Sequence, residues 1–476
     1  MDWPVSRSRW RKRSQRNKPL FLLSLSLLLI FFLAVFLSSY AEIFRSLLPF
    51  PTKTLDARSP QCGAGGAPDL AGERFLWYAP HSGFSNQLSE LKNAILMAAI
   101  LNRTLIVPPV LDHHAVALGS CPKFRVASPT ELRTAVWDHI MELVRARRYV
   151  SMADIVDLSL LASSMVKIID FRVFASTWSL LSGLQGNIDQ CIYAIQDDCR
   201  TTVWTYQQEN EGILDSFQPD KELQKKKKTS YIRKRRDVYK AFGPESKAET
   251  ATILAFGSLF TSPYKSSELY IDIHEAPRDT RIQSLLKEIE FLPFVPEIMA
   301  AGKDFAVNKI KEPFLCAQLR LLDGQFKNHW RATFSAVDQK LKTLNLELKA
   351  NKVSGPIHIF VMTDLPMVNW TGTYLADLAK DASSYRLYTL LESDELVVQA
   401  AKKLMAAEHG LRSGFLPRNL DGMDKNNACD PVTLPEILLY IEEAVCSCAS
   451  LGFVGTAGST IAESIEVMRR NNVCKL

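Results

Sequence analysis

The chain has 476 residues and a formal net charge of +6, and 47% of its residues are hydrophobic. Residues 1–18 hold seven bases and one acid, so this short tail carries a charge equal to that of the whole chain. The remaining residues are therefore close to neutral, which excludes a protein that binds nucleic acid mainly through charge. We interpret the basic runs at 225–228 and 233–236 as an exposed loop.

An apolar run from Leu20 to Leu37 is long enough to cross a bilayer. Because the bases precede it, the positive-inside rule keeps residues 1–18 in the cytosol and places the chain beyond the membrane segment, residues 19–40, in the lumen. The length of the run favours an uncleaved signal anchor, and Ser39-Tyr40-Ala41 leaves a cleaved signal peptide open as the alternative. The sequence thus predicts a single-pass type II protein of the Golgi or ER membrane.

Residues 41–72 are rich in Pro and Gly, which is typical of a flexible stem. The chain beyond the stem is too long for a single core. We therefore predict an N-terminal domain at 73–305 and a C-terminal domain at 306–476.

All nine cysteines lie beyond the membrane segment, where disulfides persist, and their odd number leaves at least one without a partner in the chain. Cys191 and Cys199 could close a local loop, whereas Cys446 and Cys448 are too close for an easy mutual bridge. No paired Cys-x-x-Cys elements are present, so we expect no structural zinc. We interpret the adjacent pair His113-His114 as structural or surface residues, because neighbouring side chains diverge.

The N-terminal domain begins with a β-α-β pattern, with strands expected at 75–78 and 104–107 around a helix at 87–101. In the turn before the helix, Gly83 permits close backbone approach, and Asn86 and Gln87 provide side-chain donors. An ordinary helix cap is the alternative role for Asn86. Between about 150 and 300 the sequence indicates only mixed helices and loops.

The second half alternates short apolar runs with helical patterns, which indicates a parallel, doubly wound sheet. Strands are expected at 314–319, 357–362, 385–390 and 451–454, and helices at 334–348, 395–408 and 435–449.

Three of these strands end in groups that suit a nucleotide-linked sugar. Arg320 follows the first and can pair with a phosphate, although pairing with Asp323 is the alternative. Asp364 follows the second and could accept from a base or ribose, or cap the next segment. After the last strand, a Gly/Ser/Thr turn opens a helix at Ser459 and Thr460, which could hold an anion or serve only as a cap.

The sequence contains no Asp-x-Asp motif, no phosphate-binding P-loop and no Gly-x-Ser-x-Gly nucleophile elbow. A diphosphate leaving group would then be neutralised by Arg320 and by the helix start at Ser459 and Thr460. We therefore expect neither a metal nor a cofactor.

Four segments, in this order, resemble the motifs of the O-fucosyltransferase family, including its large plant branch. They are Gly83-Phe-Ser-Asn-Gln87 with Leu101-Asn-Arg-Thr-Leu-Ile-Val-Pro-Pro109, Gln318-Leu-Arg320, Phe360-Val-Met-Thr-Asp364, and Phe453-Val-Gly-Thr456 through Ser459-Thr460 to Arg469. The resemblance implies a GT-B fold, with two Rossmann-like domains facing a cleft, the N-terminal one (73–305) on the acceptor side and the C-terminal one (306–476) binding the GDP-sugar. It also implies GDP-fucose as donor, inversion at the anomeric carbon and no metal requirement.

The resemblance also implies roles for individual residues. Arg320 would stabilise the departing GDP, and Ser459 and Thr460 would bind phosphate. Asp364 would help to hold the nucleoside, and Asn86 would lie beside the donor where the acceptor hydroxyl arrives. The implied donor-binding set is Gly83, Phe84, Asn86, Gln87, Gln318, Arg320, Asp364, Ser459 and Thr460.

Two positions depart from the family pattern. Gln318 stands where the family has His two residues before the Arg, and Gly83 stands where some members have Arg. These motifs also contain no obvious general base. Glu90 lies one helical turn after Asn86, and we interpret it as a surface or capping residue, with a general base as the alternative.

Our hypothesis from the sequence is a membrane-anchored fucosyltransferase whose acceptor is a protein or a glycan. A catalytically silent binder of sugar nucleotides or glycans, and a glycosyltransferase with another donor, are the alternatives. Asn102 and Asn369 begin Asn-x-Thr glycosylation sequons, which fits a luminal location.

Overall fold

The structure is a computed structural model of the chain, which falls into two compact units, residues 1–54 and 55–476. It describes residues 72–80, 83–111, 129–164, 166–175, 192–194, 204–208, 212–213, 231–235, 242–246, 248–257, 259, 280–322, 326, 329–352, 355–412 and 433–474. The predicted tail, membrane segment, nearly all of the stem, and His113-His114 lie outside these ranges. Within the described ranges, no helix combines the length and the apolar character needed to span a bilayer.

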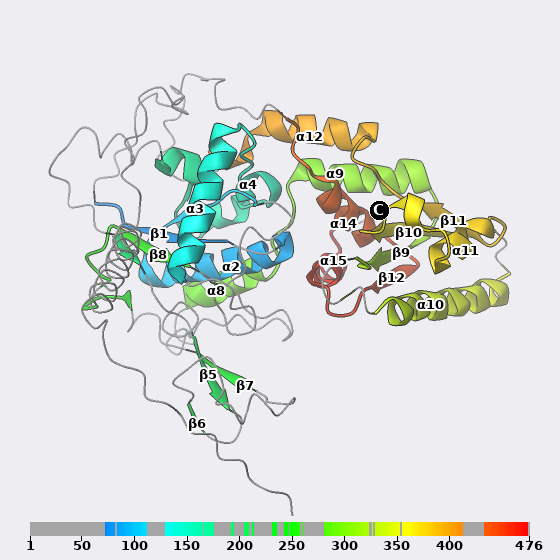
Figure 1. Cartoon of the computed structure of the whole chain (residues 1–476), viewed down its shortest axis with the longest axis horizontal. Helices are drawn as coiled ribbons and strands as arrows, with labels where there is room; N and C mark the ends of the chain where they lie inside the picture. Colours follow the sequence, from blue (N-terminus) through cyan, green and yellow to red (C-terminus); the bar gives the residue numbers. More distant parts are fainter. Residues whose placement is uncertain are drawn as a thin grey trace, which may run out of the picture. The chain divides into compact units, whose positions relative to one another are not determined.

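The first sheet of the second unit is parallel throughout, in the order β3-β2-β1-β8-β4, and its paired strands β1 and β8 are labelled in Figure 1. Its strands are β1 (Phe75–Tyr78), β2 (Thr104–Val107), β3 (Ile168–Asp170), β4 (Ile192–Ala194) and β8 (Ile253–Phe256). The predicted opening β-α-β unit is confirmed, with α2 (Phe84–Leu101) as its helix. The expectation of only helices and loops between 150 and 300 was wrong, because β3, β4 and β8 come from that part of the chain.

Both faces of the first sheet are buried, and successive residues of each strand alternate between them. On β1, Leu76 and Tyr78 pack in the same apolar cluster as the residues of α2, whereas Phe75 and Trp77 pack with those of α3. The helices that the structure describes in this half are α2, α3 (Pro129–Arg145), α4 (Met152–Ile155) and α8 (Thr280–Glu290), with a 3₁₀ turn at Ser159–Ser163.

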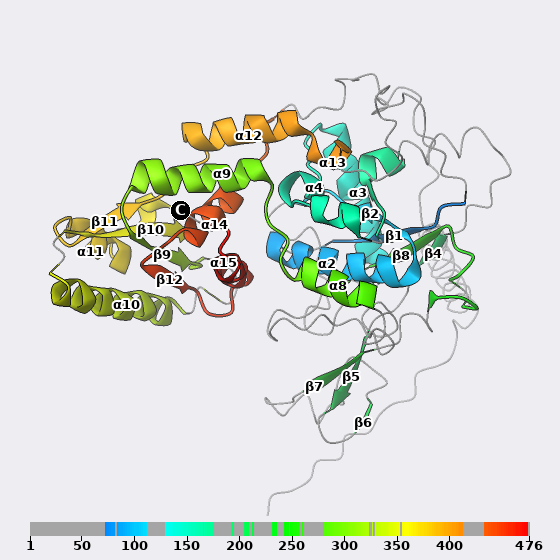
Figure 2. The same cartoon turned by 180° about the vertical axis from the view of Figure 1, so that it is seen from behind.

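The second sheet is also parallel, in the order β11-β10-β9-β12 (Figure 2). Its strands are β9 (Phe314–Leu319), β10 (Ile357–Thr363), β11 (Tyr385–Tyr388) and β12 (Gly452–Gly455). The helices described beside it are α10 (Trp330–Ala350), α11 (Tyr374–Lys380), α12 (Glu395–Ala407), α14 (Leu438–Ser447) and α15 (Thr460–Arg470), with a 3₁₀ turn at Met367–Asn369, whereas α13 (His409–Arg412) contacts α4 of the first half. The predicted α/β class with parallel sheets is confirmed.

The second sheet shows the same alternation of buried residues. On β9, Leu315, Ala317 and Leu319 pack with the apolar faces of α10 and α11. Phe314 and Cys316 face the other way and join the large cluster that includes residues of α14 and α2. One apolar core therefore covers a face of both sheets.

Helix α9 (Pro296–Asp304) continues directly into a π-helical segment at Phe305–Ile310. The predicted boundary between residues 305 and 306 thus falls inside a helical segment. Helix α9 packs against α14 and α12, so closely that a Cβ on Gly302 would clash with the Cβ of Ala444. This helix therefore belongs to the packing of the second sheet.

A third, antiparallel sheet has the order β6-β5-β7 and consists of β5 (Trp204–Gln208), β6 (Gly212–Ile213) and β7 (Tyr231–Arg235). The basic run that begins at Arg233 was predicted to be a loop, but residues 233–235 belong to strand β7. Strand β7 is an edge strand of this sheet, and charged residues are common on edge strands, which explains why the charge run was a poor guide to local structure. The basic run at 225–228 lies outside the described residues.

Candidate active site

The carboxyl ends of β9, β10 and β12 meet at one edge of the second sheet. β9 lies between the other two strands, and Gln318 is in register with Met362 of β10 and with Gly455 of β12. Arg320, Asp364 and Thr456 follow these strands and therefore lie at the same edge. In parallel α/β sheets, this is the edge where ligands bind.

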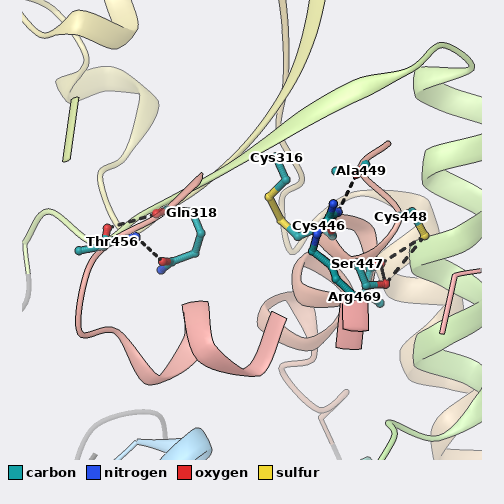
Figure 3. The surroundings of a disulfide bond; sticks show 9 residues. Cys316, Gln318, Cys446, Ser447, Cys448, Ala449, Thr456 and Arg469 are labelled. Atoms are coloured by element: carbon teal, nitrogen blue, oxygen red, sulfur yellow. Dashed lines mark hydrogen bonds between the residues drawn. A yellow bond between two sulfur atoms is a disulfide. The ribbon is translucent and has the colours of Figure 1, made fainter. Parts of the chain in front are cut away.

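Gln318 and Thr456 join the ends of β9 and β12 through buried hydrogen bonds (Figure 3). The Thr456 N–H donates to the Gln318 backbone carbonyl at 3.0 Å and to its side-chain Oε1 at 3.2 Å. The Thr456 hydroxyl also donates to that carbonyl, at 3.1 Å. In this structure the Gln318 carboxamide thus fastens the turn after β12, and its predicted ligand contact stays a prediction.

Arg320 is half-buried, and its backbone is tied to the neighbouring strand. Its N–H donates to Thr456 Oγ1 at 2.9 Å. Its guanidinium carbon lies 5.2 Å from the centre of the Phe326 ring, which is within cation–π range. Asp323, the partner considered from sequence, lies outside the described residues.

Asp364 is exposed, and both of its carboxylate oxygens accept from the segment that follows Arg320. The Leu321 N–H donates to Oδ1 at 2.7 Å, and the Leu322 N–H donates to Oδ2 at 3.0 Å. Asp364 therefore orders the backbone beside Arg320, and its predicted contact with a nucleoside stays a prediction.

The turn before α15 is built as an anion-binding helix start would be. Gly458 has a φ of +76°, a left-handed conformation that glycine adopts without strain. Ser459 is the N-cap residue in extended conformation, and its N–H donates to the Thr456 carbonyl at 3.1 Å. Its Oγ is buried and has no hydrogen-bond partner among the described residues. The following residue, Thr460, is half-buried at the first position of the helix.

Two disulfides and one arginine tie the end of α14 to its neighbours, and Figure 3 shows the bond between Cys316 and Cys446 together with Arg469. Cys316 of β9 is bonded to Cys446 of α14, and Cys448 is bonded to Cys474. The prediction that Cys446 and Cys448 do not pair with each other is therefore confirmed. Arg469 of α15 donates to the backbone carbonyls at the end of α14, those of Cys446 at 3.2 Å and Ala449 at 2.6 Å.

The residues predicted on α2 mostly serve the fold. Gly83 is the N-cap residue, and its carbonyl accepts from the N–H groups of Asn86 and Gln87. The Gln87 carboxamide is fully buried and exchanges two hydrogen bonds with the Leu111 backbone, at 3.0 and 3.2 Å. Asn86 is half-buried, and its Oδ1 has no partner among the described residues, so it has an acceptor to offer.

Aromatic packing connects α2 with the helices of the second sheet. Phe84 is buried, with its ring centre 4.5 Å from that of Tyr440 on α14 and 6.1 Å from that of Phe294. Helix α2 also contacts α15. The structure thus brings Gln318, Arg320, Asp364, Ser459 and Thr460 to one sheet edge, and places Gly83, Phe84, Asn86 and Gln87 on the helix that contacts α15.

Glu90 was predicted to be a surface or capping residue, which was wrong because its side chain is fully buried. The pKa of the Tyr78 hydroxyl is raised well above its usual value, mainly because Tyr78 is buried and in smaller part because of the charge of Glu90. Glu90 lies on the face of α2 that packs on the first sheet. Which face of a helix is buried depends on tertiary contacts, so the local sequence did not indicate that Glu90 is buried.

Asn102 and Asn369, the predicted glycosylation sites, both have exposed side chains. Asn102 caps the end of α2 in a left-handed conformation, and Asn369 ends the 3₁₀ turn after β10. Glycosylation at either stays a prediction. Within the described ranges, no group of three or more His, Cys, Asp or Glu side chains is arranged to hold a metal ion.

A parallel α/β sheet with an arginine and a helix N-terminus at its carboxyl edge is an arrangement that nucleotide-binding α/β proteins share. No family model matches the chain. The chain is 54% identical, over 495 aligned residues, to O-fucosyltransferase 30 of Arabidopsis thaliana, with 98% of this chain and 96% of that protein covered. It therefore belongs to the O-fucosyltransferase family and is a glycosyltransferase.

Among solved structures, the chain is similar to POFUT1 in complex with GDP, at 12% identity and a TM-score of 0.40, with 84% of this chain and 96% of that chain covered. POFUT1 in complex with GDP-fucose gives 11% identity and a TM-score of 0.38, with coverages of 87% and 95%. The family assignment rests on the plant relative.

Proposed function

We propose that this protein transfers fucose from GDP-fucose to a hydroxyl group of a protein or glycan, with inversion at the anomeric carbon and without a metal. The observation that carries the proposal is the convergence of Arg320 and the start of α15 at one sheet edge. There the Arg320 N–H is bonded to Thr456, which in turn accepts from the Ser459 N–H. Family membership supports the fucosyl chemistry, and the parallel double-sheet fold supports a GT-B arrangement.

The site must stabilise the negative charge that develops on the leaving group, GDP. As the bond between the fucose anomeric carbon and the β-phosphate oxygen breaks, its electron pair passes to the diphosphate. Arg320 and the first-turn N–H groups of α15 would stabilise this growing charge, which a preorganised site does better than water. Each of them is a positive partner that is in place before the reaction begins.

The acceptor oxygen then forms its bond to the anomeric carbon from the opposite face, which inverts the configuration. The hydroxyl proton becomes strongly acidic once that bond is well advanced. A weak base on the same face as the acceptor, such as a water molecule, can then take it. We place Asn86 beside the incoming hydroxyl, because its Oδ1 is an unused acceptor.

We also propose that the protein is a type II signal-anchored enzyme whose catalytic unit lies in the lumen of the Golgi or ER. The disulfides Cys316–Cys446 and Cys448–Cys474 support this location, because disulfides persist in the oxidising secretory pathway. Glycosylation at the exposed Asn102 and Asn369 would add support. Treatment of the expressed protein with an N-glycosidase, followed by a gel-shift measurement, tests that point.

The central test is Arg320→Ala, with Arg470→Ala as the matched control, since Arg470 is exposed at the far end of α15. With GDP-fucose and a panel of glycans and proteins, transfer should be lost in Arg320→Ala and kept in Arg470→Ala. Wild-type turnover in Arg320→Ala would remove the assigned role. GDP binding by the wild type without any transfer would instead select the silent binder.

Metal independence is tested separately with the wild-type enzyme. Transfer should persist in EDTA, and loss of activity that added Mg²⁺ or Mn²⁺ restores would contradict it. The configuration of the fucosidic bond in the product, read by NMR, tests inversion.

A further inference from the structure

Three consecutive backbone N–H groups directly after β9 are held by side chains from the two flanking strands. They belong to residues 320–322, which we call the Arg320 segment. Thr456, after β12, accepts the first N–H at 2.9 Å. Asp364, after β10, accepts the second and third at 2.7 and 3.0 Å.

A fourth contact completes the restraint of this short piece of chain. The Leu321 carbonyl accepts a hydrogen bond from the indole N–H of Trp330, the first residue of α10. The Leu321 side chain is fully buried in the apolar cluster beneath the sheet. Four backbone groups and one buried side chain therefore fix a segment whose first residue carries the guanidinium.

The Thr456 hydroxyl is central because it works in both directions. It accepts from the Arg320 N–H at 2.9 Å and donates to the Gln318 carbonyl at 3.1 Å. A single oxygen thus bridges two backbone groups on either side of Leu319. Thr456 is also part of the turn that leads to Ser459, so it sets the spacing between the two expected diphosphate partners.

We propose that Thr456 and Asp364 are positioning residues, which act on the reaction by fixing the Arg320 segment from both sides. The inference rests on the proposed function, since it assigns Arg320 its role with the diphosphate. Thr456 was not among the residues predicted from sequence to bind the donor, and Asp364 was expected to hold the nucleoside. In this proposal Asp364 serves instead as a clamp on the loop beside the guanidinium.

Loosening the Arg320 segment should lower the turnover number more than the affinity for the donor. A guanidinium displaced by about 1 Å can cost on the order of 100-fold in rate, because the charge it must meet develops only as GDP departs. Contacts of GDP with the rest of the site are unchanged by such a displacement. Variants that loosen the Arg320 segment should therefore lower kcat and alter KM for GDP-fucose much less.

The main variant is Thr456→Val, which keeps the shape of the side chain and removes its hydroxyl. It should lower kcat by about 10- to 100-fold, with KM for GDP-fucose within about threefold of the wild type. Thr456→Ser keeps the hydroxyl and should restore most of the rate. Asp364→Asn, which replaces one acceptor oxygen by an NH₂ group, should also lower kcat with little effect on KM.

Thr373→Val is the matched control, because its hydroxyl makes a comparable bond to a backbone carbonyl, that of Trp370 at 2.7 Å, away from the Arg320 segment. Its kcat should stay near that of the wild type. Melting temperatures of all variants separate a rate effect from unfolding. Equal losses of kcat in Thr373→Val and Thr456→Val would overturn the proposal.

A double-mutant cycle shows whether Thr456 acts through Arg320. Arg320→Lys keeps a charge and loses the guanidinium fork, so its residual turnover can serve as the background. In that background Thr456→Val should cost much less than it costs in the wild type. Full multiplication of the two losses would overturn the proposal.

Failure of the proposed function gives a different result. If the wild type binds GDP and transfers no fucose, the proposed function fails and the clamp, which acts on turnover, fails with it; transfer by the wild type with fully multiplied losses in the cycle overturns the clamp alone. If the wild type does not bind GDP, both the clamp and the proposed function fail.

Discussion

Replacing Ser459 with Ala should stabilise the free protein and weaken its binding of GDP. The Ser459 Oγ is buried and lacks a hydrogen-bond partner among the described residues, although Ser459 is the N-cap residue of α15. Leaving such a group unsatisfied costs roughly 1–3 kcal/mol. No side-chain capping bond is present at this position, so the substitution removes that cost without removing a cap.

The gain in stability should be about 1 kcal/mol, which corresponds to a rise in melting temperature of about 1–2 °C for a unit of this size. The loss of affinity should be larger. A hydrogen bond to a charged phosphate contributes about 1.5–3 kcal/mol, so GDP should bind about 10- to 100-fold more weakly. The two effects have opposite signs, which separates a ligand-binding hydroxyl from a structural one.

Thermal unfolding with and without GDP measures both effects in one experiment, because a bound ligand raises the melting temperature by mass action. Ser464→Ala, on the same helix, is the control. The Ser464 hydroxyl donates to buried Glu443 at 2.7 Å, so its removal should destabilise the free protein. A Ser459→Ala protein that is less stable than the wild type and binds GDP equally well would refute the assignment of Ser459 to phosphate.

Two further predictions concern stability. Burial raises the pKa of Glu443 to about 8 from an ordinary value of 4.5, against the Ser464 hydrogen bond that lowers it. The Glu443 carboxyl therefore binds its proton more tightly in the folded protein than in the unfolded chain. The stability that this proton contributes is present below pH 4.5 and is lost as the pH rises towards 8. Glu443→Gln should remove a slope of up to about 1.4 kcal/mol per pH unit over that window in urea unfolding, and an unchanged slope would contradict this. Gly410→Ala should lower the free energy of unfolding by about 1–3 kcal/mol. The new Cβ would lie 2.6 Å from the Cβ of Ser151 and would disturb the hydrogen bond that the Gly410 N–H donates to Asp154. A urea midpoint equal to that of the wild type would contradict this prediction.

Much of the site edge could be predicted because the signals for it are local. Apolar runs ending in Arg320 and Asp364 indicate where parallel strands stop, and parallel strands that are neighbours end at the same edge. The structure places both residues there, beside the turn that leads to Ser459. The sequence does not fix which strands are neighbours, but any order with β9 in the centre gives this convergence.

The roles of single side chains were harder to predict, because they depend on partners far away in the chain. Gln87 looked like a donor at a helix start, and its partner is the backbone of Leu111. Phe84 was expected at the donor, and it packs against Tyr440 of α14. No local pattern encodes these contacts, just as none encodes the pairing of Cys316 with Cys446.

The cross-links around α14 explain how the two proposed diphosphate partners, Arg320 and the start of α15, keep their spacing. The disulfide between Cys316 and Cys446 joins α14 to the strand that ends in Arg320. The hydrogen bonds of Arg469 join the end of α14 to α15, whose N-cap residue is Ser459. Charge stabilisation in a transition state is effective when the stabilising groups need no rearrangement as the charge appears. Strand β9, helices α14 and α15 and the disulfide hold Arg320 and the start of α15 in a fixed relation, which meets this condition. Thr456 and Ser459 set the geometry between them, because Thr456 accepts hydrogen bonds from the N–H groups of Arg320 and Ser459.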